Sequence, residues 1–383
     1  MLDVAIVGGG LCGLALANSL QAQGLTFAVF EARPRLGGRI HTVEARNNGL
    51  PMDMGAAWFW PQTQPRITHL LRKLNLASFP QHDTGNLLNL PDPETPPVPL
   101  EMDDMHSGAQ RIEGGAARLV EALAARLPGA SLHLEQVLER LVLGEDRVEL
   151  HFRHQPEPVP ARQVVLALPP RLLEERIEFV PPLNGQLRET LRETPTWMGA
   201  HAKLAASYGK PDGMDAAGID RAAFWRDDGQ SGNGVATHPR AVLGEIHDAC
   251  DALGARAGLS GFFALTAPLR AAFRLGLPML ARSQLIQWFG PRAQEAEIRI
   301  QDWADETWTS SRLDRIPAEE HPAYGNALLQ MPCWNGRLHF GGSETASHGG
   351  GYMEGALESA GRLRRELLIS RSALSGSVEA CPS

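Results

Sequence analysis

The hydrophobic positions at the start of the chain change from one period to another. Residues 3–7 form a short, apolar and β-branched run, which is typical of a buried strand. After a cluster of glycines, apolar side chains such as Leu11 and Leu14 recur at helical spacing, and Gly24 marks where that helix ends. Residues 27–30 are apolar again. The pattern predicts a strand–helix–strand unit, with which an α/β fold begins.

Further periodic segments predict the rest of the fold. Helices are expected around Leu119 to Leu127 and from 353 to 369, and strands at 147–152, 163–168 and 337–340. Residues 81–107 are rich in proline, from which we expect neither a helix nor a central strand. Residues from about 177 to 300 have mixed periodicity, which indicates a smaller α+β domain inserted into the first. The expected ranges are 1–80, 108–175 and 300–370 for the first domain, 81–107 and 176–299 for the second, and 371–383 for a disordered tail.

Composition narrows the class of protein. The chain has 383 residues, of which 43% are hydrophobic and 21% charged, as is typical of a globular protein. Its 44 acidic side chains outnumber the 36 basic ones, so nucleic acid is not expected as a partner. The four cysteines lie far apart without a paired spacing, which predicts neither a disulfide framework nor a zinc motif. A reducing, cytoplasmic setting is therefore expected.

Membrane attachment is not expected either. The apolar segment near the N-terminus lacks the basic residues of an export signal. No apolar run reaches the roughly 20 residues that a membrane-spanning helix needs. We therefore predict no membrane anchor.

The glycines after the first predicted strand are the first candidate site. Gly8, Gly10 and Gly13 fit the pattern G-x-G-x-x-G, which allows a tight turn, close approach to a pyrophosphate, and close helix–strand packing. Glu31 ends the second predicted strand, at the offset where an acidic side chain binds the ribose of an adenosine. Because the motif joins a predicted strand to a predicted helix, we interpret it as a dinucleotide-binding turn.

The residues that follow Glu31 resemble a known family. Residues 31–42 read EARPRLGGRIHT, residues 53–58 read DMGAAW, and residues 341–356 read GGSETASHGGGYMEGA. These segments resemble the flavin-containing amine oxidase family, which includes monoamine, polyamine and L-amino-acid oxidases, over residues 3 to about 370. The resemblance implies FAD as the cofactor and a discontinuous Rossmann-like domain that binds it.

The resemblance also implies which residues bind FAD. Glu31 would hold the adenosine ribose, Arg33 and Arg39 would lie by the pyrophosphate, Val137 by the adenine, and Glu344 by the ribityl chain. The expected FAD-binding residues are Gly8, Gly10, Leu11, Cys12, Gly13, Glu31, Ala32, Arg33, Gly38, Arg39, Gly55, Ala56, Ala57, Trp58, Val137, Ala167, Trp303, Gly342, Ser343, Glu344, Gly351, Tyr352, Met353 and Ala356.

A substrate site beside the flavin is implied in the same way. Two aromatic side chains orient the amine in monoamine oxidases. Tyr352 matches one of them, and Tyr324 is the nearest match for the other, while Trp303 would line the flavin. Ala323 stands where monoamine oxidases have the cysteine that links the flavin covalently. We therefore predict non-covalent FAD.

One residue of the family pattern is missing. Many members hold a water at flavin N5 with a lysine, but residues 163–202 contain none. Arg171 and Arg176 are the possible substitutes as hydrogen-bond donors, although an arginine cannot shuttle a proton. Lys203 resembles a different family lysine, which we interpret as structural. The expected catalytic residues are Tyr352, Tyr324, Trp303 and Arg176.

Residues 245–250 also collect side chains of the metal-ligand type, namely Glu245, His247, Asp248 and Cys250. Neighbours on one segment are not expected to converge around a tetrahedral ion. We interpret this segment as structural and predict no metal site.

The predicted activity is the oxidation of a small-molecule amine. Hydride passes from the carbon bearing the amine to flavin N5, and the electrons pass to dioxygen, giving hydrogen peroxide, or to another acceptor. Three alternatives stay open: a desaturase or dehydrogenase resembling protoporphyrinogen oxidases and phytoene desaturases, a renalase-like oxidase of dihydronicotinamides, and a flavoprotein without enzymatic activity. The sequence does not predict the oligomeric state.

Overall fold

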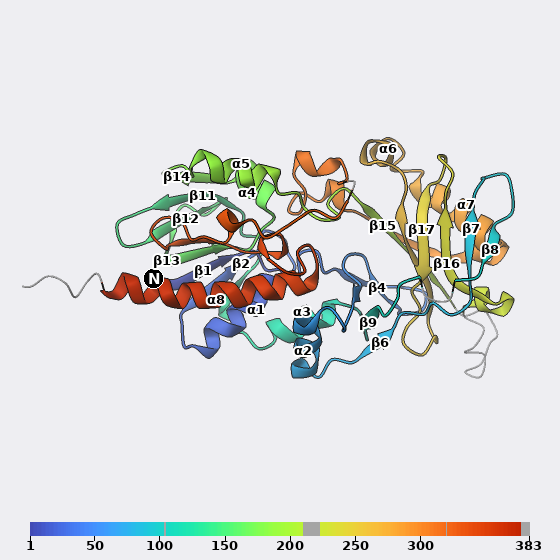
Figure 1. Cartoon of the computed structure of the whole chain (residues 1–383), viewed down its shortest axis with the longest axis horizontal. Helices are drawn as coiled ribbons and strands as arrows, with labels where there is room; N and C mark the ends of the chain where they lie inside the picture. The colour runs from blue at the N-terminus through green and yellow to red at the C-terminus, as the bar shows by residue number, and fades with distance from the viewer. Residues whose placement is uncertain (103–104, 210–222, 319, 377–383) are drawn as a thin grey trace, which may run out of the picture.

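Two large β-sheets organise the chain. In this computed structural model the described residues are 1–102, 105–209, 223–318 and 320–376. Figure 1 shows one sheet beside α1 (Leu11–Ala22) and α8 (Met353–Gly376), and the other beside α7 (Leu277–Phe289) at the opposite end of the molecule. The other helices are α2 (Pro65–Leu74), α3 (Ala117–Ala124), α4 (Pro170–Arg176), α5 (Gly185–Glu193) and α6 (Ala267–Ala272).

The first sheet has eight strands. They are β1 (Leu2–Val7), β2 (Phe27–Phe30), β10 (Leu132–His133), β11 (Leu138–Leu143), β12 (Val148–Phe152), β13 (Val159–Leu166), β14 (Glu178–Val180) and β20 (Leu338–Phe340). Their order is β10-β2-β1-β13-β12-β11-β14, with β20 paired to β13. β1 is parallel to both β2 and β13, and α1 connects β1 to β2. The predicted strand–helix–strand unit and the α/β fold class are confirmed.

The second sheet has seven strands. They are β7 (Asn86–Leu90), β8 (Val98–Leu100), β15 (Ala202–Tyr208), β16 (Gln230–Ala236), β17 (Leu243–Asp248), β18 (Ala257–Phe263) and β19 (Glu297–Asp302). Their order is β19-β15-β18-β17-β16-β7-β8. Two smaller sheets contain β3 (Thr42–Glu44) with β4 (Pro51–Asp53), and β5 (Trp58–Phe59) with β6 (Ser78–Pro80) and β9 (Gln110–Ile112).

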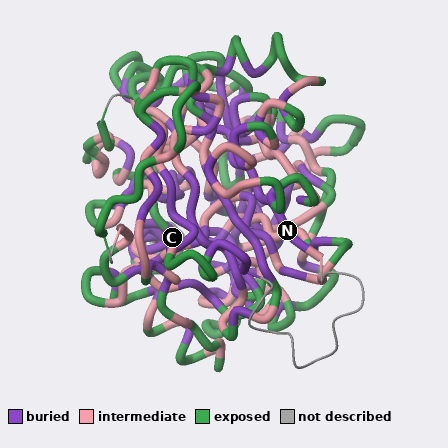
Figure 2. The backbone as a smooth tube through the Cα atoms, turned by 90° about the vertical axis from the view of Figure 1, so that its right-hand side faces the viewer, coloured by how far each residue is buried: buried purple, intermediate pink, exposed green. Residues whose placement is uncertain are grey.

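Side-chain alternation along β1 explains why both faces of the first sheet are covered. Val4 and Ile6 pack into a core with apolar side chains of α1, α3 and α8. Ala5 and Val7 face the other way, into a core shared with α4 and α5. Figure 2 shows the buried segments gathered inside the molecule and the exposed ones around its outside. A strand buried on both faces is typical of a parallel α/β sheet.

The proline-rich segment departs from its prediction. β7 is paired on both sides, in parallel with β16 and antiparallel with β8, so residues 86–90 form a central strand that we did not expect. The reason is local: β7 contains no proline and buries Leu87, Leu88 and Leu90. The prolines lie in the exposed edge strand β8 and in the loop before it, where proline is tolerated.

The sheets also divide the chain differently from the expected domain ranges in two places. β14 and α5 were expected in the inserted domain, but β14 pairs with β11, and Leu187 and Leu191 of α5 lie in the core of the first sheet. β19 crosses the expected boundary at 300 and pairs with β15 of the second sheet. Long-range strand pairing, which periodicity does not reveal, decides these boundaries.

The C-terminal helix is longer than expected. α8 begins at Met353 as predicted but continues to Gly376, so the expectation of a disordered tail from 371 is wrong for residues 371–376. Residues 377–383 lie outside the described part of the chain. Within that part, no helix has both the length and the apolar character that crossing a membrane requires.

Candidate functional site

A cavity of about 380 Å³ is lined by residues of the loops that follow strands of the first sheet, by strand residues of the second sheet and by the start of α8. Most of the predicted site residues line it. These are Gly8, Gly10, Leu11, Cys12, Glu31, Arg33, Gly38, Arg39, Gly55, Ala56, Ala57, Trp58, Ala167, Trp303, Gly342, Ser343, Glu344, Gly351, Tyr352, Met353 and Ala356.

Five predicted site residues do not line this cavity: Gly13, Ala32, Val137, Tyr324 and Arg176. Gly13 has the packing role expected of the third glycine, because a Cβ there would lie 2.1 Å from the Gly8 carbonyl oxygen. The segment before Val137 does lie beside the end of β2, where Gln136 N–H donates to the Glu31 carbonyl at 2.8 Å.

Glu31 organises the turn between β1 and α1. Its carboxylate accepts hydrogen bonds from the backbone N–H groups of Gly9, at 2.8 Å, and Arg33, at 3.0 Å. Only 4% of Glu31 is exposed, so the charge is held by backbone donors rather than by water. The Arg33 guanidinium donates to the Glu31 carboxylate at 3.4 Å and to the Thr309 hydroxyl at 2.7 Å.

Arg39 and Glu344 tie the first glycine-rich segment to the C-terminal one. The Arg39 guanidinium lies 2.7 Å from one oxygen of the Glu344 carboxylate and donates to the other at 2.9 Å. It also donates to the Ser343 hydroxyl at 3.0 Å. Glu344 is 1% exposed. A two-point ion pair between residues 305 positions apart therefore joins two segments of the cavity wall.

Three observations show that the end of the cavity beside the turn between β1 and α1 fits a dinucleotide. A Cβ on Gly10 would meet no protein atom closer than 4.0 Å and would project into the cavity that a ligand needs. The N-terminus of α1 has no side-chain cap, so its backbone N–H groups are available to an anion. Arg33 Nε is buried, and within the described residues no hydrogen-bond acceptor meets it.

Lys203 is the functional candidate that the sequence interpretation missed. Its side chain lines the cavity, and Nζ donates to the Gly55 carbonyl at 3.1 Å. Nζ also lies 5.8 Å from the ring centroid of Trp58 and 5.7 Å from that of Phe262. Burial lowers the pKa of Lys203 to about 8. Because β15 directs this side chain into the cavity, Lys203 is a candidate functional residue as well as a structural one.

Arg176, by contrast, lies behind the cavity wall. Its guanidinium sits 5.5 Å from the ring centroid of Trp308, and it is Trp308 that lines the cavity. Arg171 is engaged with Asp314 at 2.7 Å, also outside the cavity. Neither arginine lines the cavity, whereas Lys203, on β15, does.

The aromatic wall differs from the expected pair of tyrosines. Tyr352 lines the cavity, but its parallel neighbour is His321, with ring centroids 5.2 Å apart and 5° between planes. His321 also contacts Trp197, another lining residue, at 4.5 Å. Tyr324 lies on the far side of His321 and donates its hydroxyl to the Pro195 carbonyl at 2.8 Å. Burial raises the pKa of this hydroxyl.

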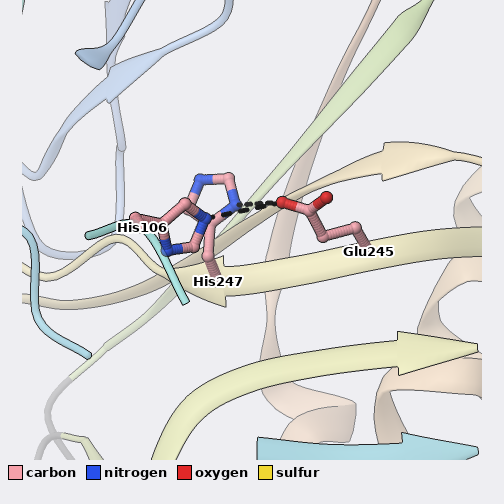
Figure 3. Close-up of side chains that lie close together, drawn as sticks. All are labelled: His106, Glu245 and His247. Carbon is pink, nitrogen blue, oxygen red and sulfur yellow. Dashed lines mark ion pairs between the residues drawn. The ribbon is translucent and has the colours of Figure 1, made fainter. Parts of the chain in front are cut away.

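Glu245 is a second lining residue that the analysis interpreted as structural. It lies with His247 on β17, and His106, from the loop before β9, joins them (Figure 3). Residues i and i+2 of a strand share a face, and a third side chain can meet them from another segment, so this cluster cannot be recognised within residues 245–250 alone.

Comparison with known proteins agrees with this geometry. The sequence profile of the flavin containing amine oxidoreductase family matches residues 11–104 and 99–244. Amine oxidase [flavin-containing] B of Sus scrofa is 25% identical, with 96% of this chain and 86% of that protein covered.

Two solved structures share the fold. A putrescine oxidase bound to putrescine superimposes with a TM-score of 0.76 at 22% identity, covering 96% of this chain and 99% of its own. Cyclohexylamine oxidase from Brevibacterium oxydans gives 0.74 at 19% identity, covering 98% and 99%.

The fold and the cavity define a flavoprotein oxidoreductase, and the chain belongs to the flavin-containing amine oxidoreductase family. Within that family it is an enzyme of the flavin-dependent amine oxidase class.

Proposed function

We propose that this enzyme binds FAD non-covalently and oxidises an amine to the corresponding imine, with dioxygen as the electron acceptor. The observation that carries the proposal is the continuity of one cavity. Gly10, Glu31 and Arg39 line its dinucleotide end, and Lys203 and Tyr352 also line it. One cavity therefore joins a cofactor site to a site for the reacting group.

The domain assignment follows from the same cavity. The eight-stranded sheet, with α1 and α8, carries the dinucleotide end and forms the proposed FAD-binding domain. The seven-stranded sheet contributes Lys203, Glu245 and Phe262 and forms the proposed substrate domain. The flavin ring would lie between them.

Cysteine placement supports non-covalent binding. Among the described residues that line the cavity, Cys12 is the sole cysteine, and it belongs to the glycine-rich turn at the dinucleotide end. Burial raises the pKa of its thiol, which keeps the thiol protonated and unreactive. Ala323 offers no sulfur at the position where a covalent link would form in the related monoamine oxidases.

When bound, FAD supplies the acceptor for the two electrons that leave the carbon bearing the amine. The protein's tasks are to orient the amine, to exclude water and to favour the uncharged amine. Lys203 shows how the cavity treats a primary amine, because burial there lowers the pKa from 10.5 to about 8. A substrate amine beside the same aromatic rings is shifted in the same direction, towards the neutral form that reacts.

The test is anaerobic absorbance of the purified yellow enzyme. Primary, secondary and polyamines, amino acids and dihydronicotinamides are added one at a time, and air is admitted afterwards. We expect one amine class to bleach the flavin and air to restore its colour rapidly. Bleaching by dihydronicotinamides alone would contradict the proposal, and slow recovery in air would overturn its choice of acceptor. Acid precipitation should release the flavin into the supernatant if binding is non-covalent.

A further inference from the structure

His106, Glu245 and His247 form a compact cluster in the cavity wall (Figure 3). One potential ligand atom from each lies within 4.8 Å of the others. His106 Nε2 is 3.5 Å and His247 Nδ1 is 4.0 Å from the same carboxylate oxygen of Glu245. We propose that these three side chains bind one divalent transition-metal ion of the Zn²⁺ class. This proposal does not depend on the proposed amine oxidase activity.

Two ring nitrogens in the cluster are buried and face the same carboxylate oxygen of Glu245. His106 Nε2 and His247 Nδ1 are shielded from solvent, and neither makes a hydrogen bond to any described residue. The side chains are 8% and 3% exposed. A buried polar nitrogen without a hydrogen bond is costly, and a cation shared by the two nitrogens and the carboxylate would satisfy all three groups.

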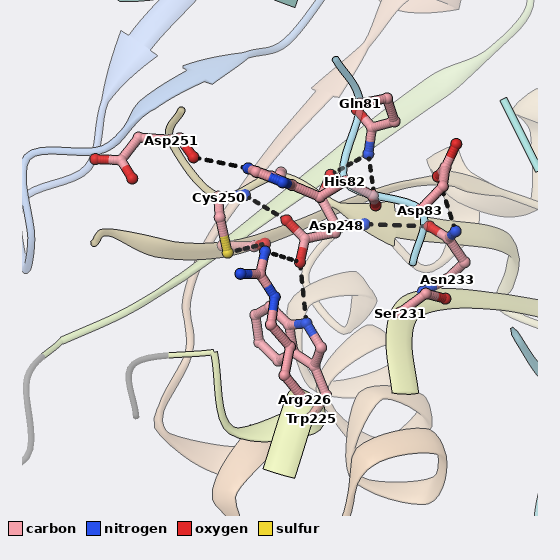
Figure 4. Close-up of polar contacts among 12 residues, drawn as sticks. Gln81, His82, Asp83, Trp225, Arg226, Ser231, Asn233, Asp248, Cys250 and Asp251 are labelled. Carbon is pink, nitrogen blue, oxygen red and sulfur yellow. Dashed lines mark hydrogen bonds and ion pairs between the residues drawn. The ribbon is translucent and has the colours of Figure 1, made fainter. Parts of the chain in front are cut away.

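The surrounding residues hold His106 in the orientation that a metal ligand needs. Asp83 accepts a hydrogen bond from His106 Nδ1 at 2.9 Å, and its other oxygen accepts from the His106 backbone N–H at 3.0 Å. Asn233 donates to Asp83 at 2.9 Å, as Figure 4 shows. A histidine that donates one ring N–H to a carboxylate presents the other nitrogen to a metal.

Trp58 positions both imidazoles. Its ring centroid lies 4.5 Å from that of His106 and 4.4 Å from that of His247, so one indole packs against the two ligands. The Trp58 indole N–H donates in turn to the Gln81 side chain at 3.0 Å. The two ligands therefore belong to one packed unit rather than to mobile surface chains.

The ligand types and spacing suit zinc. Two imidazole nitrogens and one carboxylate oxygen are a common ligand set of zinc sites that keep a fourth position open. Bonds of about 2.0–2.1 Å at tetrahedral angles place ligand atoms about 3.3 Å apart. The distances to Glu245 exceed this by roughly 0.2 and 0.7 Å, and all three ligand atoms lie within 4.8 Å of one another, so the side chains must rotate inward to bind the ion. Because Glu245 also lines the cavity, the fourth position is open to a water or a substrate atom.

Some charges near the cluster disfavour the binding of a dication, and others favour it. Lys203 and Arg111 act electrostatically on His247. Arg111 is already bound to the carbonyl oxygens of Ala249 and Cys250, at 3.2 and 2.7 Å. Glu245 and Asp83 bring two carboxylates to the site, which offset these cations. A moderate affinity is therefore expected.

The test is metal binding by the FAD-loaded, tag-free enzyme. The protein is stripped with a chelator, passed through a desalting column and titrated with Zn²⁺ against a chromophoric competitor. We expect one equivalent to bind, with affinity lowered at least about 100-fold in His247→Phe and in Glu245→Gln. Asp83→Asn should lose about 10- to 100-fold, because it removes the support of one ligand.

His133→Phe is the matched control. His133 lies on β10 of the eight-stranded sheet, whereas Glu245 and His247 lie on β17 of the seven-stranded sheet, and phenylalanine preserves the stack of residue 133 on Phe30. It should bind Zn²⁺ as the wild type does. Equal binding by the wild type, His247→Phe and Glu245→Gln would overturn the proposal, as would no binding by the wild type.

A measurement on the wild-type protein tests the proposal even if the variants fail to fold. One equivalent of Co²⁺ added to the stripped wild type should produce the intense ligand-field bands of a tetrahedral site, at wavelengths beyond the flavin absorbance. Excess Zn²⁺ should abolish these bands. Weak bands of hexahydrated Co²⁺ alone would contradict a three-ligand protein site.

Discussion

The two ends of the cavity are built in different ways. At the dinucleotide end, Gly10, Glu31 and Arg39 come from one continuous segment, and Glu344 joins them from a second glycine-rich segment. At the substrate end, Lys203, Glu245 and Phe262 come from three strands of the other sheet, and Trp197 from the segment before it.

This difference teaches where sequence motifs are informative. A turn such as residues 8–13 is constrained by its own backbone, so its residue types repeat wherever the turn occurs. A side chain such as Lys203 needs only the right strand and the right face, which its sequence neighbours do not specify. Four substitutions test the contrast.

Arg39→Leu is expected to have the largest effect. It leaves the Glu344 carboxylate, 1% exposed, without its charged partner. Removing one partner of a buried ion pair costs about 3–5 kcal/mol. Urea unfolding of the purified protein measures this loss, and the flavin retained on gel filtration reports the dinucleotide end. In Arg118→Leu, whose pair with Glu121 is exposed on both sides, we expect a change of only a few tenths of a kcal/mol.

Lys203→Met tests the proposed substrate end of the cavity through the pH dependence of protein stability. Burial lowers the pKa of Lys203 to about 8, from 10.5, so between these values the unfolded chain binds the proton and the folded protein does not. The stability of the wild type relative to Lys203→Met should therefore rise by about 3 kcal/mol as pH rises through this window. Below pH 8 both states carry the charge and the full cost of burying it remains. Parallel stability curves for the two proteins would falsify a depressed pKa.

Gly13→Ala tests the turn without touching the cavity. The added Cβ meets the Gly8 carbonyl oxygen at 2.1 Å, so helix and strand must separate. Overpacking of this kind costs roughly 1–3 kcal/mol and should weaken flavin retention. Gly185→Ala is the control, because a Cβ there meets nothing within 4 Å. Thermal unfolding of both variants gives the comparison, and equal melting temperatures would show that the turn tolerates the methyl group.

Tyr324→Phe should have the smallest effect and separates packing from catalysis. The substitution removes the hydrogen bond to the Pro195 carbonyl, a loss of about 1 kcal/mol in the free energy of unfolding. Because Tyr324 does not line the cavity, kcat/KM should stay within about twofold of the wild type. Tyr352→Ala, at a lining position, should lower kcat/KM strongly. A large loss of kcat in Tyr324→Phe would restore the pair of tyrosines expected from the sequence.

Particular residues show which parts of the site could be predicted from the sequence. Glu31 and Glu344, which the sequence places at the FAD site, both line the cavity, and each could be found because it belongs to a motif of glycines and acidic side chains with specific spacing. Lys203 was interpreted as structural, and its entry into the cavity could not be predicted because it depends on the pairing of β15 with β18 and β19. His106 carried no local signal at all. Its role appears only when the loop before β9 meets β17.

The sequence by itself determined the α/β fold class, the glycine-rich turn between β1 and α1 and membership of the flavin-containing amine oxidoreductase family. These features depend on residues that are close in the chain, where backbone geometry restricts which amino acids fit. The tertiary structure decided the substrate end: Lys203 as the cavity lysine, His321 beside Tyr352, and Glu245 with its two histidines. The physical reason is that strand register and long-range packing bring these side chains together, and neither is encoded in a local pattern.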